Sequence, residues 1–363
     1  MARKLKPDRI LFFVTLTLVA FGVAMVFSSS AVMAKEKFGD PNYFAFKQLL
    51  AATIGFAVMF IVMKVDYHAY RHPGLVFSML ALVVALLVLV FFLASQAATH
   101  RWIVLPGFSF QPSELGKLAL IFFLAYFLER RQNQINDVKF TLLPIAVIMG
   151  LLATLVVAEP DLGTALSMVL VTATLLFVAG LDYRWYAFSA LAAVPVFYFL
   201  VYRVSWRYDR ILAFLHPWDD PLGKGFQIIQ SLISVGGGGV LGVGYMEGKQ
   251  KLFYLPEAHT DFIYSVVGEE LGLIGTLGVL LLFGVFLWRG LRAATHAPDT
   301  FGFYLALGIT AMVCIQAFIN MSVVLGLMPT KGIPLPFLSY GGSSFVVMLA
   351  AVGILLNVSQ QSS

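Results

Sequence analysis

The chain has 363 residues, of which 60% are apolar and 12% are charged, and its formal net charge is +5. Soluble domains are about 45–50% apolar, so this composition indicates an integral membrane protein. The single cysteine, Cys314, excludes a disulfide framework and a cysteine-based metal centre, and no basic run interleaved with aromatic residues suggests a nucleic-acid partner.

The first predicted element is an apolar segment that follows a basic start and runs to about Ala34. It is longer than the core of a signal peptide and has no small-x-small cleavage site, so we expect an uncleaved transmembrane helix. Further apolar segments have the length of about 20 residues that a membrane-spanning helix needs. The ten predicted spans cover about 10–33, 47–63, 74–94, 112–128, 140–158, 163–180, 186–203, 262–288, 303–325 and 341–358.

These spans predict an all-α polytopic protein in which residues 1–363 form a single membrane domain, with both termini on one side. The short loops on the terminal side hold most of the Lys and Arg, so the positive-inside rule predicts that both termini are cytoplasmic. That side holds Arg3, Lys4, Lys6, Arg9, Lys64, Arg71, Arg130, Arg131, Lys139, Arg184, Arg289 and Arg292, and the opposite short loops hold only Lys35, Lys37, Lys47, Arg101 and Lys331. The one long non-apolar segment, about 204–260, is then an extracytoplasmic loop between the seventh and eighth spans.

The sequence FQPSELGKLAL at 110–120 opens the fourth span, with Pro112 in a first turn that tolerates proline. Glu114 and Lys117 lie three residues apart, so their side chains can meet on one helix face. Charges inside a membrane are costly, and by default they face a bundle interior or an aqueous cavity and serve function. The alternative is a lysine that extends to the interface beside a structural partner.

A glycine-rich run, GGGGVLG at 236–242, formally matches the dinucleotide-binding pattern. That pattern requires a strand before it and a helix after it in a βαβ unit. Because the run lies in the predicted extracytoplasmic loop, we interpret the match as accidental and expect the glycines to permit a close turn or local mobility.

The sequence YLPEAHTDFIYSVVGEELG at 254–272 contains four carboxylates, Glu257, Asp261, Glu269 and Glu270. If the eighth span starts near Thr260–Asp261, with Thr260 as the N-cap, Glu269 lies about 12 Å further along the axis and Glu270 on the opposite face. A glycosidase-like acid pair needs carboxyls within about 5–9.5 Å. Asp261 is therefore the one prominent acid, with Glu257 and His259 close enough in the preceding loop to approach it.

The sequence GLMPTKGIPLPFLSYGGSS at 326–344 places three prolines and several glycines at or near membrane depth, where the backbone cannot form a plain helix. Irregular backbone is tolerated there only when it is buried in protein or lines a water-filled cavity. We therefore predict that Lys331 points into such a cavity, and we include Ser339 of the same segment among the candidate substrate-binding residues. An ordinary loop between two helices is the alternative.

One acid with several cations outside the membrane suits a transfer whose leaving group is a lipid pyrophosphate. Such a reaction needs one base to deprotonate the attacking hydroxyl and cations to stabilise the departing charge. Arg207 and Arg210 in the long loop are candidates for those cations. A transporter that only binds such a lipid could use the same residues.

Over essentially its whole length the chain resembles the SEDS family (shape, elongation, division and sporulation), the FtsW/RodA group of bacterial peptidoglycan polymerases. The similarity rests on the ten spans, on the large loop and on five motifs. These are FQPSELGKLAL, AEPDLGTA, DPLGKGFQIIQSLISVGGGGVLGVG, KLFYLPEAHTDFIYSVVGEELG and GLMPTKGIPLPFLSYGGSS. FLHPWDDP, LPEAHTDFI and MPTKG are more similar to the division branch, FtsW, than to the elongation branch, RodA.

The resemblance implies a glycosyltransferase that polymerises lipid II, an undecaprenyl-pyrophosphate disaccharide-pentapeptide, into glycan strands. It implies that Asp261 is the essential acid that activates the GlcNAc 4-hydroxyl, that Lys117 beside Glu114 is the basic residue of the QPSELxK motif, and that Arg101 is the basic residue ahead of it. The expected location is the bacterial cytoplasmic (inner) membrane, with the active site outside, during septal wall synthesis. The expected partners are a class B penicillin-binding protein, which supplies transpeptidation, other divisome proteins and membrane lipids.

Three alternatives stay open: a lipid II flippase, an elongation-branch polymerase, and a non-catalytic scaffold that activates its partner. A divalent cation, Mg²⁺ or Mn²⁺, is a further open question. Glu257, His259 and Asp261 could ligate one, but a site to which the substrate supplies most ligands has no reliable spacing signature.

Overall fold

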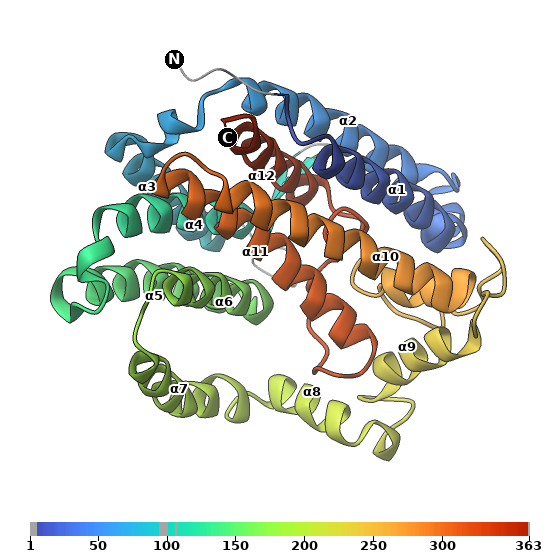
Figure 1. The fold of residues 1–363 in the computed structure, drawn as a ribbon. Helices are drawn as coiled ribbons and strands as arrows, with labels where there is room; N and C mark the ends of the chain where they lie inside the picture. Colours follow the sequence, from blue (N-terminus) through green and yellow to red (C-terminus); the bar gives the residue numbers. More distant parts are fainter. Residues whose placement is uncertain (1–5, 94–100, 106–107, 362–363) are drawn as a thin grey trace.

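The computed structural model describes residues 6–93, 101–105 and 108–361. Arg3 and Lys4, which the orientation argument includes, lie outside the described residues. The described chain is a bundle of helices with one short hairpin, which confirms the predicted all-α membrane architecture (Figure 1).

Each of the ten predicted spans corresponds to a helix of the bundle. These helices are α1 (Arg9–Phe38), α2 (Tyr43–Lys64), α3 (Pro73–Leu93), α4 (Pro112–Arg130), α5 (Leu143–Ala158), α6 (Leu162–Val178), α7 (Tyr183–Phe197), α10 (Ile263–Thr295), α11 (Thr300–Val324) and α12 (Gly342–Gln361). Within the described ranges, eight helical segments are long and apolar enough to cross a membrane by themselves. The other two are α4, which carries Glu114, Lys117 and Glu129, and α6, which has only 17 residues.

Shorter elements connect these helices. They are the 3-10 turns Tyr67–Arg71, Gln132–Gln134 and Pro217–Asp219, the π-helical turns Val138–Leu142 and Tyr198–Tyr202, the strands β1 (Ile103–Leu105) and β2 (Phe108–Phe110), and the helices α8 (Ser205–Leu215) and α9 (Phe226–Gly237). The two strands form an antiparallel hairpin directly before α4. Much of the predicted 204–260 loop is therefore helical.

The two termini lie at the same end of the bundle (Figure 1). The backbone N–H of Asp8 donates to Ser359 Oγ at 3.2 Å, and the Asp8 carboxylate accepts from Arg289 Nε at 2.8 Å. At the same end, Asn357 of α12 accepts from the N–H of Tyr67 at 2.9 Å. These contacts agree with an even number of membrane crossings.

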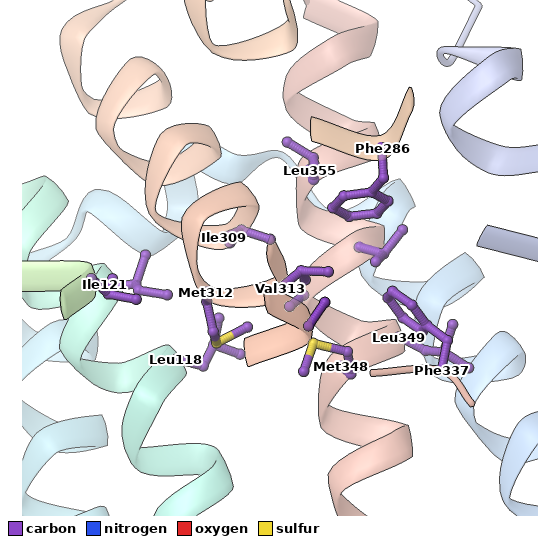
Figure 2. Close-up of a cluster of buried hydrophobic side chains, with 14 of the residues drawn as sticks. Leu118, Ile121, Phe286, Ile309, Met312, Val313, Phe337, Met348, Leu349 and Leu355 are labelled. Carbon is purple, nitrogen blue, oxygen red and sulfur yellow. The ribbon is translucent and has the colours of Figure 1, made fainter. Parts of the chain in front are cut away.

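The centre of the bundle is formed by α4, α11 and α12, with one buried aromatic from α10 and one from the segment before α12. Figure 2 shows part of this core, with Leu118, Ile121, Phe286, Ile309, Met312, Val313, Phe337, Met348, Leu349 and Leu355. Small residues allow the closest helix contacts, as is usual in membrane bundles. A Cβ added at Gly353 of α12 would lie 2.6 Å from the carbonyl oxygen of Met59 in α2, so only glycine fits there.

Helix α10 bends sharply at Gly272, whose φ is +64° and ψ is −156°. The break releases the carbonyl groups of Glu269 and Glu270, and these accept the N–H groups of Val243 and Gly244, each at 3.0 Å. Backbone groups freed at a kink must be satisfied again by neighbouring protein. The glycine-rich run makes this approach possible, since a Cβ at Gly238 would lie 2.0 Å from the carbonyl oxygen of Gly268 on α10. The prediction of a close turn there is confirmed.

Helix α7 differs from the other spans because it has no buried residue. It lies apart from α5 and α6 in Figure 1. Near its start, the N–H of Asp182 donates to Asn136 Oδ1 at 2.9 Å and the hydroxyl of Tyr186 donates to the carbonyl of Ala173 at 3.0 Å. The helix is thus held to the bundle at this end and diverges from it along its length.

Candidate functional site

Asp261 lies in a turn directly before α10, which begins at Ile263. The predicted start at Thr260–Asp261, with Thr260 as the N-cap, is therefore wrong. The Thr260 hydroxyl instead donates to the Glu257 carboxylate at 2.9 Å, and the N–H of Phe262 donates to the carbonyl of Glu257 at 3.2 Å. This local turn occupies the backbone groups that would otherwise begin the helix, and it leaves Asp261 outside the helical geometry.

The turn is joined to the proline-rich 326–344 segment by one side chain of α11. Asn320 Nδ2 donates to the carbonyl oxygen of Asp261 at 2.7 Å and to that of Ile333 at 2.8 Å. The Asp261 carboxylate points toward Gly332, because a Cβ on that glycine would lie 3.1 Å from Asp261 Oδ2. Asp261 and the residues beside Lys331 therefore form one site, as the sequence motifs predict.

Burial raises the pKa of Asp261 to about 7, although part of its surface remains accessible. The negative charges of Glu257 and Asp161 raise this pKa further, and the positive charges of Arg101 and Arg210 lower it. Four charged residues from separate parts of the chain thus act on one carboxyl group. A carboxyl group that loses its proton near neutral pH is suited to work as a general base.

Arg101 is positioned by the AEPDLGTA turn between α5 and α6. Its Nε donates to the carbonyl oxygen of Glu159 at 3.0 Å, and a second guanidinium nitrogen donates to the carbonyl of Pro160. Asp161 then caps α6 by accepting from the N–H of Thr164 at 3.0 Å. From the sequence, AEPDLGTA stands out only as one of the motifs of the family resemblance. The signal that could have marked it as part of the site is two acids around a proline between apolar spans.

Glu159 itself is fully buried, and neither of its carboxylate oxygens has a hydrogen-bonding partner within the described ranges. Burial raises its pKa to about 8, with a further rise from Asp161 and an opposing effect of Arg101. Glu159 is therefore mainly protonated at neutral pH. The buried acid next to Arg101 thus does not cancel the positive charge of the guanidinium.

The two arginines of α8 have different surroundings. Arg207 is buried and donates to the carbonyl oxygen of Leu200 at 2.8 Å and to that of Val157 at 3.5 Å, so it ties α8 to the end of α5. Arg210 is exposed, its guanidinium lies 5.2 Å from the ring centre of Trp206, and no described carboxylate forms an ion pair with it. Arg210 is therefore the better placed of the two to meet an anionic ligand.

Glu114 and Lys117 form the predicted ion pair, at 2.9 Å, and each side chain is only 4% exposed. Lys117 Nζ also donates to Gln316 Oε1 at 2.7 Å, and Gln316 Nε2 donates to the carbonyl oxygen of Pro334 at 3.0 Å. The pair thus supports the segment that carries Lys331. The Lys331 ammonium has no hydrogen-bonding or ion-pairing partner among the residues that the structure describes, and burial lowers its pKa.

Ser339 and His259 lie where the turn that carries Asp261 meets the 326–344 segment. The Ser339 hydroxyl donates to the carbonyl of Thr260 at 2.5 Å and accepts from the N–H of Leu335 at 2.8 Å. The His259 ring lies 4.8 Å from the ring of Phe44 and 5.8 Å from that of Tyr340. Burial lowers the pKa of His259, which favours the neutral ring.

The remaining two acids of the 254–272 stretch bind elsewhere, as predicted. Glu270 accepts from Lys251 Nζ at 2.6 Å and from the hydroxyl of Ser28 in α1 at 2.7 Å. Glu269 accepts from the N–H groups of Lys249 and Gln250 at 2.7 and 3.2 Å. The pair therefore shapes the loop that leads to Asp261.

The described residues were compared with the ligand sets that a metal ion needs. Among the residues that the structure describes, no group of three or more His, Cys, Asp or Glu is placed to hold a metal ion. The set of Glu257, His259 and Asp261 is thus not a preformed cation site.

Comparison with known proteins shows the family to which the chain belongs. The family of cell cycle proteins named for FtsW, RodA and SpoVE matches residues 8–363. A protein named probable peptidoglycan glycosyltransferase FtsW, from Geobacter sulfurreducens, is 48% identical over 97% of this chain and 95% of the relative. Stage V sporulation protein E of Bacillus subtilis is 46% identical over 99% of both chains.

Two solved structures share the fold. A chain of a peptidoglycan synthase complex, described as coordinating polymerization and crosslinking, superposes with a TM-score of 0.79 at 31% identity and covers 97% of each chain. The rod shape determining protein RodA of Thermus thermophilus superposes with a TM-score of 0.71 at 28% identity, covering 97% of this chain and 96% of RodA.

Proposed function

This chain belongs to the FtsW/RodA/SpoVE family of cell cycle proteins, and from this premise we infer that it is a peptidoglycan glycosyltransferase of the division branch. The observation that carries the chemistry is the position of Asp261. It lies beside Gly332, with a pKa of about 7 and under the influence of Arg101 and Arg210. One base facing several cations is the set that sugar transfer from a pyrophosphate requires.

In the proposed reaction, the substrate is lipid II. The Asp261 carboxylate takes the proton of the GlcNAc 4-hydroxyl of one substrate while the hydroxyl oxygen attacks the anomeric carbon of the other. The bond from that carbon to the pyrophosphate oxygen breaks, and the pyrophosphate leaves with the bonding electron pair. Arg101, Arg210 and Lys331 stabilise its negative charge.

The other candidate residues have supporting positions in this proposal. Lys117 and Glu114 hold Gln316 and through it the segment around Lys331. Ser339 holds that segment against the turn of Asp261. Arg207 fixes α8, the helix that carries Arg210, and the charge of Arg210 acts on Asp261.

The chain is a multi-pass membrane protein, and we place it in the bacterial cytoplasmic (inner) membrane with Asp261 on the outer side. The excess of Lys and Arg in the loops of the terminal side supports this orientation. The likeness to a chain of a peptidoglycan synthase complex supports a class B penicillin-binding protein as the partner that crosslinks the product, and the FtsW-type relatives support a place among divisome proteins.

The direct test is the product formed from lipid II by the purified protein with its partner transpeptidase. We expect glycan polymer on a gel, in detergent, where no leaflets exist. A flippase would move labelled lipid II between the leaflets of liposomes and make no polymer. Transport without polymer would overturn the proposed function.

The rate of polymerisation is expected to rise with pH, because Asp261 must be deprotonated to act as a base. Its pKa of about 7 predicts a rate that increases tenfold per pH unit well below pH 7 and becomes constant above it. Arg210 lowers this pKa and Glu257 raises it, so Arg210→Gln should shift the midpoint upward and Glu257→Gln downward. Asp209→Asn, next to Arg210 on α8, is the control that should leave the midpoint unchanged. If both variants shifted the midpoint in the same direction, Asp261 would not be the base whose pKa sets the pH profile.

A further inference from the structure

A small charged cavity lies at the end of the bundle that holds the two termini, where the segment before α1 meets the last turns of α10 and α12. We call it the basic pocket. Its volume of about 220 Å³ is below the range of about 300–1,000 Å³ that is usual for small-molecule sites, so it suits a compact ionic group better than a nucleotide. The charged and polar side chains that line it are Lys6, Asp8, Arg289, Arg292, His296 and Ser359.

The basic pocket carries an excess of positive charge. Among the described residues that line it, Asp8 is the one carboxylate, and both of its oxygens are engaged. Oδ1 accepts from the N–H of Leu11 at 3.0 Å and caps α1, and Oδ2 accepts from Arg289 Nε at 2.8 Å. Lys6 and Arg292 form no ion pair and no side-chain hydrogen bond within the described ranges. Two cations are therefore available to an anion, beside a third that Asp8 holds in place.

The next acid along the chain does not neutralise these cations. Asp299 comes three residues after His296 but does not line the basic pocket. Its carboxylate lies 2.8 Å from His68 Nε2 and accepts from the Tyr67 hydroxyl at 2.6 Å. The same carboxylate caps α11 by accepting from the N–H of Gly302 at 2.7 Å. Its charge is thus used in another set of contacts.

The basic pocket adjoins a surface of α10 that faces the membrane. Leu281, Trp288 and Arg292 follow one another at spacings of seven and four residues, so they lie on one face of the helix. Leu281 is 65% exposed and Trp288 is 58% exposed, and Arg292 is exposed as well. An exposed tryptophan near the end of a membrane-spanning helix is typical of the membrane interface. An apolar face that leads directly to available cations matches a lipid with a negatively charged headgroup.

We propose that the basic pocket binds the phosphodiester of an anionic phospholipid, whose acyl chains lie along Leu281 and Trp288. Lys6 and Arg292 donate charge-assisted hydrogen bonds to the phosphate oxygens, as in other basic pockets between membrane-spanning helices. The apolar face of α10 selects the lipid over free phosphate. A bound headgroup joins the start of α1 to the ends of α10 and α12, so it stabilises the folded bundle. This site lies at the opposite end of α10 from Asp261 and goes beyond the proposed function.

The test measures the melting temperature of the purified protein in a non-ionic detergent as phospholipid is added. We expect dioleoylphosphatidylglycerol to raise it and dioleoylphosphatidylcholine to leave it nearly unchanged. The double variant Lys6→Gln with Arg292→Gln should need an at least about tenfold higher concentration of phosphatidylglycerol for half of the effect. The matched control is Lys139→Gln with Arg184→Gln, which removes two exposed charges from loops of the terminal side but outside the basic pocket. It should respond like the unmodified protein.

An equal loss of response in the two double variants would show an effect of net charge alone and would overturn the site. An equal rise in melting temperature with inorganic phosphate, at the same concentration as phosphatidylglycerol, would show a site for free anions and would overturn the lipid assignment. No response to phosphatidylglycerol in the unmodified protein would also overturn it. None of these measurements requires polymerisation, so their outcome is independent of the proposed function.

A second measurement leaves all the cations in place and so does not depend on the folding of the charge variants. In nanodiscs, phosphatidylglycerol with brominated acyl chains should quench the fluorescence of a tryptophan that it contacts. The signal of Trp288 is the difference between the unmodified protein and Trp288→Phe. We expect brominated phosphatidylglycerol to quench this signal more strongly than the same fraction of brominated phosphatidylcholine. Equal quenching by the two lipids would contradict the proposal.

Discussion

Asp261→Asn is expected to abolish glycan polymerisation while the protein remains folded. Asparagine has nearly the shape of aspartate but cannot take a proton from the attacking hydroxyl, and loss of a general base lowers a rate by about 10²–10⁴-fold. The fold should be retained because Asn320 binds the backbone carbonyl of Asp261 rather than its carboxylate. The measurement is the initial rate of polymer formation from lipid II, with a thermal unfolding curve for each protein.

The sign of the stability change provides a second readout for the same variant. The pKa of Asp261 is raised by folding from 3.8 to about 7, so the folded protein loses stability as pH rises through the range between these values. Asp261→Asn removes that loss, and its melting temperature at pH 8 should be equal to or higher than that of the unmodified protein. Asp209→Asn, which removes a surface carboxylate paired with Lys224 at 2.8 Å, is the control with expected normal activity. Full activity of Asp261→Asn would remove this residue from the mechanism.

Lys117→Met is expected to destabilise the protein by about 3–5 kcal/mol, because it leaves the Glu114 carboxylate buried without its cation. The double variant Glu114→Gln with Lys117→Met removes both charges and should recover most of this loss. Removal of the exposed Asp209–Lys224 pair is the control and should change stability by less than about 1 kcal/mol. Reversible unfolding in detergent measures all of these variants, and a double variant as unstable as Lys117→Met would contradict the ion-pair argument.

Activity measurements distinguish two roles that Lys117 could have. One is direct contact with the substrate, and the other is support of the 326–344 segment. Gln316→Leu cuts the link from Lys117 to the carbonyl of Pro334 but leaves the Glu114–Lys117 pair in place. If Lys117 acts through Gln316, this variant should lose activity as strongly as the stable double variant does. Normal activity in Gln316→Leu would instead favour a direct contact between Lys117 and the pyrophosphate.

Several features of the site follow from local sequence, because they depend on residues that are close along the chain. Glu114 and Lys117 meet as predicted, since a spacing of three places them on one helix face. Glu269 and Glu270 also bind away from Asp261, as predicted. The prediction assumed a helix start near Thr260–Asp261, however, and the helix begins at Ile263. The turn that displaces the helix start depends on the Thr260 contact with Glu257, and propensity alone does not reveal that contact.

Other features required the folded structure, because they join distant parts of the chain. Arg101 reaches the carbonyl of Glu159, 58 residues away, and Asn320 reaches that of Asp261, 59 residues away. Neither Glu159 nor Asn320 can be singled out from the sequence, because a single acid in a turn and a single amide in an apolar helix have no distinctive spacing. The different surroundings of Arg207 and Arg210 could not be predicted for the same reason.

The sequence by itself determined the membrane class, the ten helices, the common side of the termini and the family motifs, because hydropathy and motif spacing are local properties. Only the tertiary structure decided which charges surround Asp261, which acids instead hold loops, and which basic side chains gather beside Asp8. These depend on how helices pack against one another. In a membrane bundle that packing is set by shape and by a few polar contacts rather than by hydrophobicity, which nearly every span shares.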